Sequence, residues 1–330
     1  MSGPLLEVDA LRVQIDAEDP DARPVRAVDG VSFEIERGEV LGLVGESGCG
    51  KTLTGLALLG RLPRPRGRIA GGAVRLDGID LTALAEPERR AIRGRRMAMI
   101  FQDPMTSLNP YLRIGDQLIE GAVWQGGVTR RAALRRAEAL LARVGIPDAR
   151  ARLRSFPHEL SGGMRQRAMI AMALLAEPDL LIADEPTTAL DVTIQAQILA
   201  LLAALRAERG MSMLLITHDL GVVAGLCDRV LVMYAGQIVE SGPVRALFDR
   251  PYHPYTRALL RSTPRIGARA ARLASLDGLP PRLDAAPMPG CRFEPRCALA
   301  RPACREAEPA LEGIAEGRDR RCIAGLEELA

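Results

Sequence analysis

The sequence predicts an α/β fold with a doubly wound parallel sheet, and three observations support this. Short, wholly apolar runs such as Val40–Val44 have the length and composition of buried parallel strands. Helix-length segments separate several of these runs, as crossover connections between parallel strands require. The run at 40–44 leads through a glycine-rich loop into a helix pattern.

The expected elements follow in the order of such a fold. Alternating apolar and polar residues at 5–15 and 31–36 predict an antiparallel edge sheet before the first buried strand. Helix patterns replace strand patterns from about 104 to 165, so an inserted helical subdomain is expected there. Further buried strands are predicted at 97–101, 180–183, 213–217 and 229–234.

Composition indicates how the chain is divided into domains and in which cellular compartment the protein is found. Proline and arginine become more frequent after Gly242, so we expect one large domain at 1–245 and a small C-terminal extension at 246–330. No apolar run approaches the ~20 residues of a membrane-spanning helix, and the N-terminus has no secretory-signal pattern. The sequence therefore predicts a cytosolic protein.

Charge argues against nucleic acid as a partner. The net charge is only +3, from 44 basic and 41 acidic residues. Aromatic residues make up 3% of the chain, too few for the stacking platforms of single-strand binders.

The glycine-rich loop matches the complete pattern G-x-x-x-x-G-K-[ST], in which backbone N–H groups surround phosphate oxygens. Lys51 would bridge the β- and γ-phosphates of a nucleotide, and the Thr52 hydroxyl would bind Mg²⁺. The alternative is a tight strand-to-helix turn without a ligand. The loop consists of Gly45, Glu46, Ser47, Gly48, Cys49, Gly50, Lys51 and Thr52.

Lysine usage favours the nucleotide over the empty turn. Lys51 is the only lysine among the 44 basic residues of the chain. A compact ammonium suits crowded phosphates better than a planar guanidinium does. A sequence that uses arginine everywhere else therefore keeps lysine where a phosphate-binding loop needs it.

Two adjacent carboxylates, Asp184 and Glu185, end the buried strand that begins at Leu180. Such a pair can divide the work of hydrolysis. Asp184 would hold Mg²⁺, directly or through water, and Glu185 would orient and polarise the attacking water. Acidic residues at strand ends are common, so the pair alone is a weak signal.

A further motif, Leu160-Ser-Gly-Gly-Met-Arg-Gln-Arg167, precedes the two carboxylates. With it, the chain resembles the ABC ATPase family over about residues 5 to 245. The first five residues of the motif resemble the signature loop of that family, and Gln102 its glutamine loop. Ala189-Leu190-Asp191 resembles its D-loop, and His218 its switch histidine. The resemblance implies an ABC-type P-loop nucleotide-binding domain that binds ATP and Mg²⁺.

The resemblance also implies roles for single residues. Glu185, Gln102 and His218 are expected to serve hydrolysis, and Thr52, Gln102 and Asp184 to surround Mg²⁺. It adds Asp191 to the nucleotide-binding residues.

The signature loop predicts assembly. Ser161, Gly162 and Gly163 open a helix whose N-terminal amides suit an anion. In the family that anion is the γ-phosphate held by a partner subunit, so two ATP molecules lie between two domains. A monomer is therefore expected to be nearly inactive.

The chain departs from the family pattern in two places, the signature loop and the residue that usually stacks on the adenine of ATP. Met164 stands where the family most often has glutamine, and peptide-importer members resemble this chain there. After Val13 the family usually has an aromatic residue that stacks on adenine, whereas this chain has Ile15. Adenine is expected to rest on aliphatic side chains instead.

The branch of the family is indicated by two segments. Ile100–Pro110 and His253–Thr256 resemble ATPases of dipeptide and oligopeptide importers. That resemblance implies a second, non-identical ATPase subunit, two membrane permease subunits and an external peptide-binding protein as partners. It also places the chain at the cytoplasmic face of the cell membrane. Nickel and glutathione importers are near relatives and stay open as alternatives.

The extension carries a cluster of four cysteines, which in a reducing cytosol suggests a metal before disulfides. Their separations of five, six and seventeen residues contain none of the C-x₂₋₄-C pairs usual for zinc. Resemblance to peptide-importer tails favours a [4Fe–4S] cluster with a structural role; zinc or no metal are the alternatives. The cysteines are Cys291, Cys297, Cys304 and Cys322.

Two other functions are kept as alternatives. One is a soluble ABC ATPase that acts on nucleic acid, against which the near-neutral charge and the single ATPase unit argue. The other is an ATPase regulated by oxidation of the cysteine cluster.

Overall fold

The structure is a computed structural model that describes residues 3–19, 22–103, 107–124, 128–187, 191–262, 278–281 and 288–329. Its contacts divide the chain into two compact units. The first unit comprises Met1–Ile35, Val40–Thr82 and Leu215–Ala330. The second comprises Glu36–Glu39 and Ala83–Leu214.

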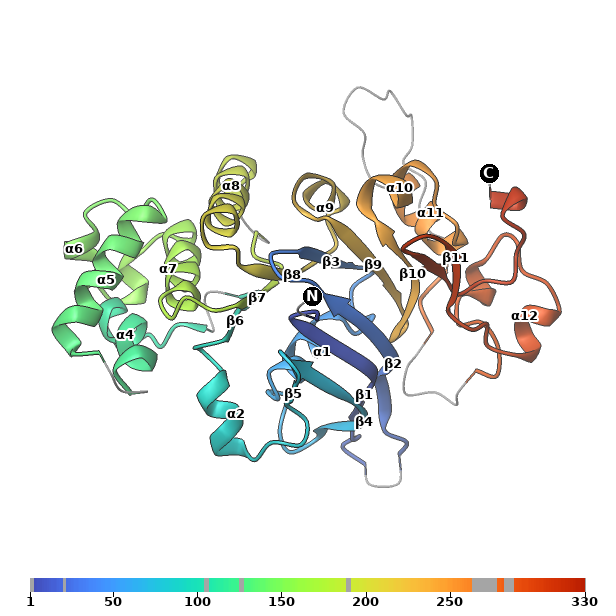
Figure 1. Cartoon of the computed structure of the whole chain (residues 1–330), viewed down its shortest axis with the longest axis horizontal. Coiled ribbons are helices and arrows are strands. Elements are labelled where there is room, and N and C mark those ends of the chain that lie inside the picture. The colour runs from blue at the N-terminus through green and yellow to red at the C-terminus, as the bar shows by residue number, and fades with distance from the viewer. Residues whose placement is uncertain are drawn as a thin grey trace. The chain divides into compact units, whose positions relative to one another are not determined.

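The first unit contains the expected antiparallel sheet, with strand order β2-β1-β4-β5 (Figure 1). Asp29 and Gly30 interrupt the alternation of apolar and polar residues in the middle of β2. The first half of this strand was therefore not predicted from the sequence. In the structure β2 nevertheless begins at Val25, because the whole strand pairs with β1, with several register shifts along the way. The four strands are β1 (Leu6–Ile15), β2 (Val25–Ile35), β4 (Gly67–Leu76) and β5 (Ile79–Asp80).

A second sheet in the first unit joins the core to the C-terminal extension. The buried strands β3 and β9 pair in parallel, and β10 pairs antiparallel with β9 after a turn at Ala235-Gly236, whose φ angles are 45° and 85°. The extension adds β12 to β10 and β11 to β12 (Figure 1). These strands are β3 (Val40–Val44), β9 (Arg229–Tyr234), β10 (Gln237–Pro243), β11 (Glu312–Ala315) and β12 (Arg318–Arg320).

Short helices complete the first unit. Their buried side chains and those of β9 form a core that also includes Tyr255 and Phe293 of the extension. The extension is therefore packed into the core of this unit. The helices are α1 (Lys51–Leu58), α9 (Leu220–Leu226), α10 (Val244–Asp249), α11 (Pro254–Ser262), η2 (Glu294–Arg296), α12 (Ala303–Glu306) and η3 (Glu327–Leu329).

The second unit combines two parallel strands with a group of helices. Strands β6 (Met97–Ile100) and β7 (Leu180–Asp184) pair in register and are fully buried. Strand β8 (Ser212–Thr217) begins in this unit and ends in the first. The helices are α2 (Glu86–Ile92), α4 (Ile114–Trp124), α5 (Arg130–Arg143), α6 (Ala149–Arg152), η1 (Pro157–Glu159), α7 (Gly162–Leu174) and α8 (Val192–Arg209).

Local sequence explains where several of these helices begin. Thr129, Ser161 and Asp191 precede α5, α7 and α8, and each side chain accepts a hydrogen bond from a backbone N–H in the first turn. Helices α4, α5 and α7 pack against one another (Figure 1). Within the described part of the chain, no helix combines the length and apolarity needed to cross a bilayer.

Candidate active site

The phosphate loop connects β3 to α1, and two of its glycines are required by close backbone approaches. Gly45 and Gly50 have φ angles of 157° and 110°. A Cβ atom at Gly45 would collide with the Met233 carbonyl oxygen, and one at Gly50 with the Ala27 carbonyl oxygen. Only glycine allows this path. Helix α1 begins at the end of this path without a side-chain N-cap, and the uncapped N-terminal amides of a helix suit an anion.

Lys51 folds back over the loop that precedes it. Its Nζ donates to the carbonyl oxygens of Gly45 at 2.8 Å and Glu46 at 2.9 Å, and lies 3.8 Å from Cys49 Sγ. Burial raises the pKa of the Cys49 thiol, although the neighbouring ammonium opposes the rise. The thiol is therefore neutral, and Lys51 is the cation beside the concave backbone, as a phosphate site requires.

The predicted carboxylates lie at the end of β7 in the second unit. Asp184 is 1% exposed. Glu185 has a φ of 45°, a left-handed conformation that costs a non-glycine residue about 1–3 kcal/mol and is typical of functional sites. Its carboxylate accepts a hydrogen bond of 3.1 Å from Gln102 Nε2, which follows the paired strand β6. The structure thus brings together two residues predicted separately.

The signature residues begin α7, also in the second unit. Ser161 Oγ accepts from the Met164 N–H at 3.3 Å, and Ser161 and Gly162 are exposed. Gln166, 1% exposed, donates to the Pro186 carbonyl at 2.7 Å. This hydrogen bond ties the signature helix to the segment that follows Glu185.

The two other predicted landmarks also occupy strand or helix ends. His218 follows β8, is exposed and belongs to the first unit, as the phosphate loop does. Asp191 Oδ1 accepts from the Ile194 N–H at 2.9 Å, which makes it the N-cap of α8 in the second unit. The preceding D-loop residues, Ala189 and Leu190, lie outside the described residues.

Residues 288–329, here called the cysteine module, bring the four tail cysteines together in the first unit. All four are free thiols. They line one cavity of about 20 Å³, with His253 and Phe293 among its other walls. Burial, and then the nearby thiols Cys322 and Cys304, raises the pKa of Cys291; burial raises the pKa of Cys297 to about 11.

The thiols share a cavity, but their side chains do not form a finished ligand set. Among the residues that the structure describes, no group of three or more His, Cys, Asp or Glu side chains is arranged to hold a metal ion. The four cysteines are suitable donors for the expected cluster or for zinc, but their sulfur atoms are not arranged as the ligands of a metal ion.

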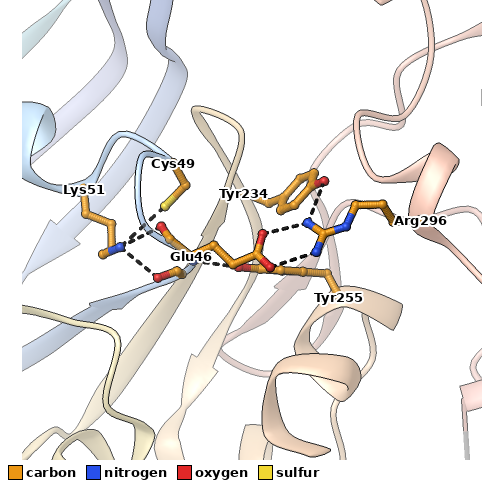
Figure 2. A network of polar contacts seen from close by, with 7 residues as sticks. Glu46, Cys49, Lys51, Tyr234, Tyr255 and Arg296 are labelled. Carbon is orange, nitrogen blue, oxygen red and sulfur yellow. Dashed lines mark hydrogen bonds and ion pairs between the residues drawn. The ribbon is translucent and has the colours of Figure 1, made fainter. Parts of the chain in front are cut away.

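Sequence analysis did not anticipate a contact between this module and the phosphate loop. Arg296 donates to both carboxylate oxygens of Glu46, and Tyr255 Oη accepts from the Glu46 N–H, as Figure 2 shows. No periodicity or motif links Arg296 to the loop. Its position between Cys291 and Cys297 was the only available signal.

Comparison with known proteins identifies the family. The model of the ABC transporter family matches residues 28–188, and that of the oligopeptide/dipeptide transporter C-terminal region matches residues 239–304. The oligopeptide transport ATP-binding protein OppD of Salmonella typhimurium is 50% identical over 98% of this chain and 95% of its own length. The chain belongs to the ATP-binding subunits of ABC transporters, in the oligopeptide and dipeptide branch. The dipeptide transport ATP-binding protein DppD of Escherichia coli is also 50% identical, over 98% of both chains.

Solved structures support the fold. A dimeric structure of MJ0796, a bacterial ABC transporter cassette, has a TM-score of 0.64 at 26% identity and covers 73% of this chain and 99% of the other. A post-hydrolysis dimer of the same cassette bound to ADP and Pi gives the same TM-score at 25% identity, with coverage of 73% and 99%. The predicted ABC-type P-loop fold is confirmed, and the chain is an ATPase of this family. The comparisons favour this function over a nucleic-acid factor or a redox-regulated ATPase.

Proposed function

We propose that this subunit binds and hydrolyses ATP to power the import of dipeptides or oligopeptides. The observation that carries the proposal is similarity over nearly the whole chain, extension included, to proteins named for oligopeptide and dipeptide transport. The same names favour peptides over nickel or glutathione as cargo. The phosphate loop, with Lys51 folded over its carbonyl groups, supports the nucleotide part of the proposal.

Residue roles follow from chemistry and local geometry. Lys51 would neutralise the β- and γ-phosphates, and Thr52, Asp184 and Gln102 would hold Mg²⁺. Glu185 orients and polarises the attacking water. The hydrogen bond between Gln102 and Glu185 supports this assignment, because it places the candidate base against the candidate magnesium ligand.

The remaining motif residues act across a dimer in this proposal. Ser161, Gly162 and Gly163 begin α7, and the N-terminal amides of this helix bind the γ-phosphate held by a second ATPase subunit. His218 and Asp191 complete the nucleotide site. Their exposed or capping positions at strand and helix ends support such roles. The dimeric structures of MJ0796 support pairing of cassettes, and the second subunit here is proposed to be non-identical.

The proposed complex lies at the cytoplasmic face of the membrane. It adds two permease subunits and an external peptide-binding protein. We also propose the organisation into a nucleotide-binding domain at 1–245, with helices inserted at about 104–165, and an extension at 246–330.

A [4Fe–4S] cluster is proposed for the cysteine module, with zinc as the alternative. The shared cavity of the four thiols supports it, and thiolate is the ligand such clusters prefer. Bound there, the cluster would join four segments of a module whose helices span only three or four residues. Its role is structural, because small modules gain most from such staples.

The test of the main proposal is transport. The chain is co-purified anaerobically with its membrane subunits, reconstituted in liposomes, and assayed for ATP-dependent uptake of a labelled oligopeptide, with nickel and glutathione as competing cargoes. Peptide uptake supports the proposal; uptake of nickel or glutathione alone contradicts the cargo. Iron, sulfide and zinc measured on the same sample decide the metal.

Hydrolysis is tested separately with Glu185→Gln. The variant should retain Mg-ATP and lose about 10²–10⁴-fold of turnover, the usual contribution of a positioned base. Glu208→Gln is the matched control, because Glu208 lies on α8 of the same unit in an exposed ion pair with Arg143. Equal turnover in the two variants would refute the role of Glu185.

A further inference from the structure

Arg296 of the cysteine module forms a partly buried bridge to the phosphate loop. Its side chain is 4% exposed, and its Nη1 and Nη2 donate to Glu46 Oε2 and Oε1 at 2.7 and 2.9 Å. Two parallel hydrogen bonds between a guanidinium and a carboxylate are strong and directional. They raise the pKa of Arg296 further above its ordinary value. Glu46 is the second residue of the phosphate loop.

Aromatic side chains pack around the Arg296 end of this bridge, whereas the Glu46 side chain is 25% exposed. Tyr234 and Tyr255 are 1% and 0% exposed, and Arg296 lies over the Tyr234 ring at 5.8 Å (Figure 2). Phe293, from the turn that holds Arg296, contacts both rings with centroid separations of 5.2 and 5.4 Å. Charges interact more strongly in such surroundings than in water.

Every polar group of Glu46 is held by a defined partner. Its N–H donates to Tyr255 Oη at 2.8 Å, and its carbonyl oxygen accepts from Lys51 Nζ at 2.9 Å. Its carboxylate is held by Arg296. The residue that helps to orient the phosphate-binding ammonium is therefore fixed from outside the loop.

The other end of the bridge is one short turn between two of the cysteines. Arg296 is the last residue of η2, and its N–H donates to the Phe293 carbonyl at 3.0 Å. The N–H groups of Cys291 and Cys297 donate to the carbonyls of Cys304 and Glu294 at 2.7 and 3.1 Å. Displacement of the thiols would move this turn and Arg296 with it.

We propose that Arg296 is a positioning residue for the phosphate loop, through which the cysteine module controls nucleotide affinity. By pairing with Glu46 it orients the loop and neutralises a carboxylate that would otherwise repel the triphosphate. The proposal rests on the proposed ATP function. It adds control of nucleotide affinity to the structural role expected of the module, which is distant in sequence from the ATP motifs.

The first test is Mg-ATP affinity, measured by calorimetry on the full chain. Arg296→Met should raise the dissociation constant about tenfold, because it leaves the Glu46 carboxylate unpaired beside the phosphates. The matched control is Arg318→Met, since Arg318 on β12 forms another ion pair of the module, a buried one, with Glu240 on the adjacent strand β10. That control should lose stability while its affinity changes less than about twofold.

A double-mutant cycle separates positioning through Glu46 from general damage. In a Glu46→Gln background, Arg296→Met should have little further effect on affinity, because no carboxylate is left to repel phosphate. An equal loss of affinity in both backgrounds, or in Arg318→Met, would overturn the proposal. If Arg296→Met fails to fold, Arg296→Lys keeps the charge but loses the two-pronged geometry, and should weaken affinity in the wild-type background alone.

The coupling is tested by replacing all four module cysteines with serine. Mg-ATP affinity should fall as in Arg296→Met, and it should not fall further when the serines are added to the double variant Glu46→Gln, Arg296→Met. Unchanged affinity in the serine variant would refute the coupling.

Failure of the ATP function gives a different result from failure of the bridge. Wild-type chain that binds Mg-ATP no better than Lys51→Ala would defeat the proposed function. The bridge would still be measurable, as coupling between Glu46 and Arg296 in the stability of the chain to urea.

Discussion

The phosphate loop and the cysteine module both contact Tyr255, through Glu46 and Phe293, but are stabilised differently. In the loop, polar groups are held by hydrogen bonds along one continuous segment, as Lys51 is by the carbonyls of Gly45 and Glu46. In the module, thiols from separate segments meet in a small cavity, and burial raises the pKa values of Cys291, Cys297 and Cys322. The loop is therefore preformed for an anion, whereas the module depends on packing and on whatever joins its thiols.

The largest expected effect on this comparison comes from Lys51→Ala. Mg-ATP affinity should fall about 100-fold, because the variant removes charge-assisted hydrogen bonds to the phosphates. Calorimetric titration measures the loss. Lys51→Arg should also bind poorly, because a planar guanidinium does not fit where a compact ammonium folds onto the loop. Tight Mg-ATP binding by the alanine variant would contradict the preformed anion site.

Replacement of the four module cysteines by serine should destabilise the module before the loop. Each buried hydroxyl without a partner costs about 1–3 kcal/mol in an apolar cavity. Amide hydrogen exchange should therefore accelerate at 291–304 while β3, which is fully buried, stays protected. Equal acceleration in both segments would mean that loop and module unfold as one unit.

Acid should weaken the module through His253. Burial lowers its pKa from 6.5 to about 3, and its Nδ1 accepts from the Tyr255 N–H at 3.1 Å, which requires the neutral ring. The unfolded chain takes up this proton near pH 6.5 and the folded chain only near pH 3. Between these values the unfolded state binds more protons, so stability falls as the pH falls.

His253→Asn tests this acid sensitivity by urea unfolding at several pH values. The wild-type free energy of unfolding should fall by at most about 1.4 kcal/mol per pH unit below pH 6.5 from this group, and the variant should lose that part of the slope. His158→Asn, an exposed histidine of the second unit, is the control. Identical slopes in wild type and His253→Asn would contradict the assignment.

The smallest expected effect is that of Arg130→Ala, whose exposed ion pair can be compared with the partly buried pair of Arg296 and Glu46. The side chains of Arg130 and Asp116 are 64% and 39% exposed, so their ion pair is screened by solvent. The free energy of unfolding should change by less than about 1 kcal/mol. A larger loss would show that exposed pairs matter as much here as buried ones, and would weaken the contrast drawn for Arg296.

The local sequence was sufficient to predict the strands whose own residues determine their conformation. Wholly apolar runs predicted β3, β6, β7, β8 and β9 to within a residue or two, because strands buried on both faces exclude polar side chains. Strands β11 and β12 were not predicted. They are short and polar, and pairing with the edge of β10 stabilises them.

For the site, the sequence by itself determined the phosphate loop and the order of the ATPase motifs. The loop is continuous, and its glycines and single lysine act within eight positions. Only the tertiary structure decided which distant groups meet. Gln102 contacts Glu185 across 83 positions, and Arg296 contacts Glu46 across 250. Such pairs leave no periodic pattern in the sequence, because sheet pairing and the packing of Tyr234, Tyr255 and Phe293 bring them together.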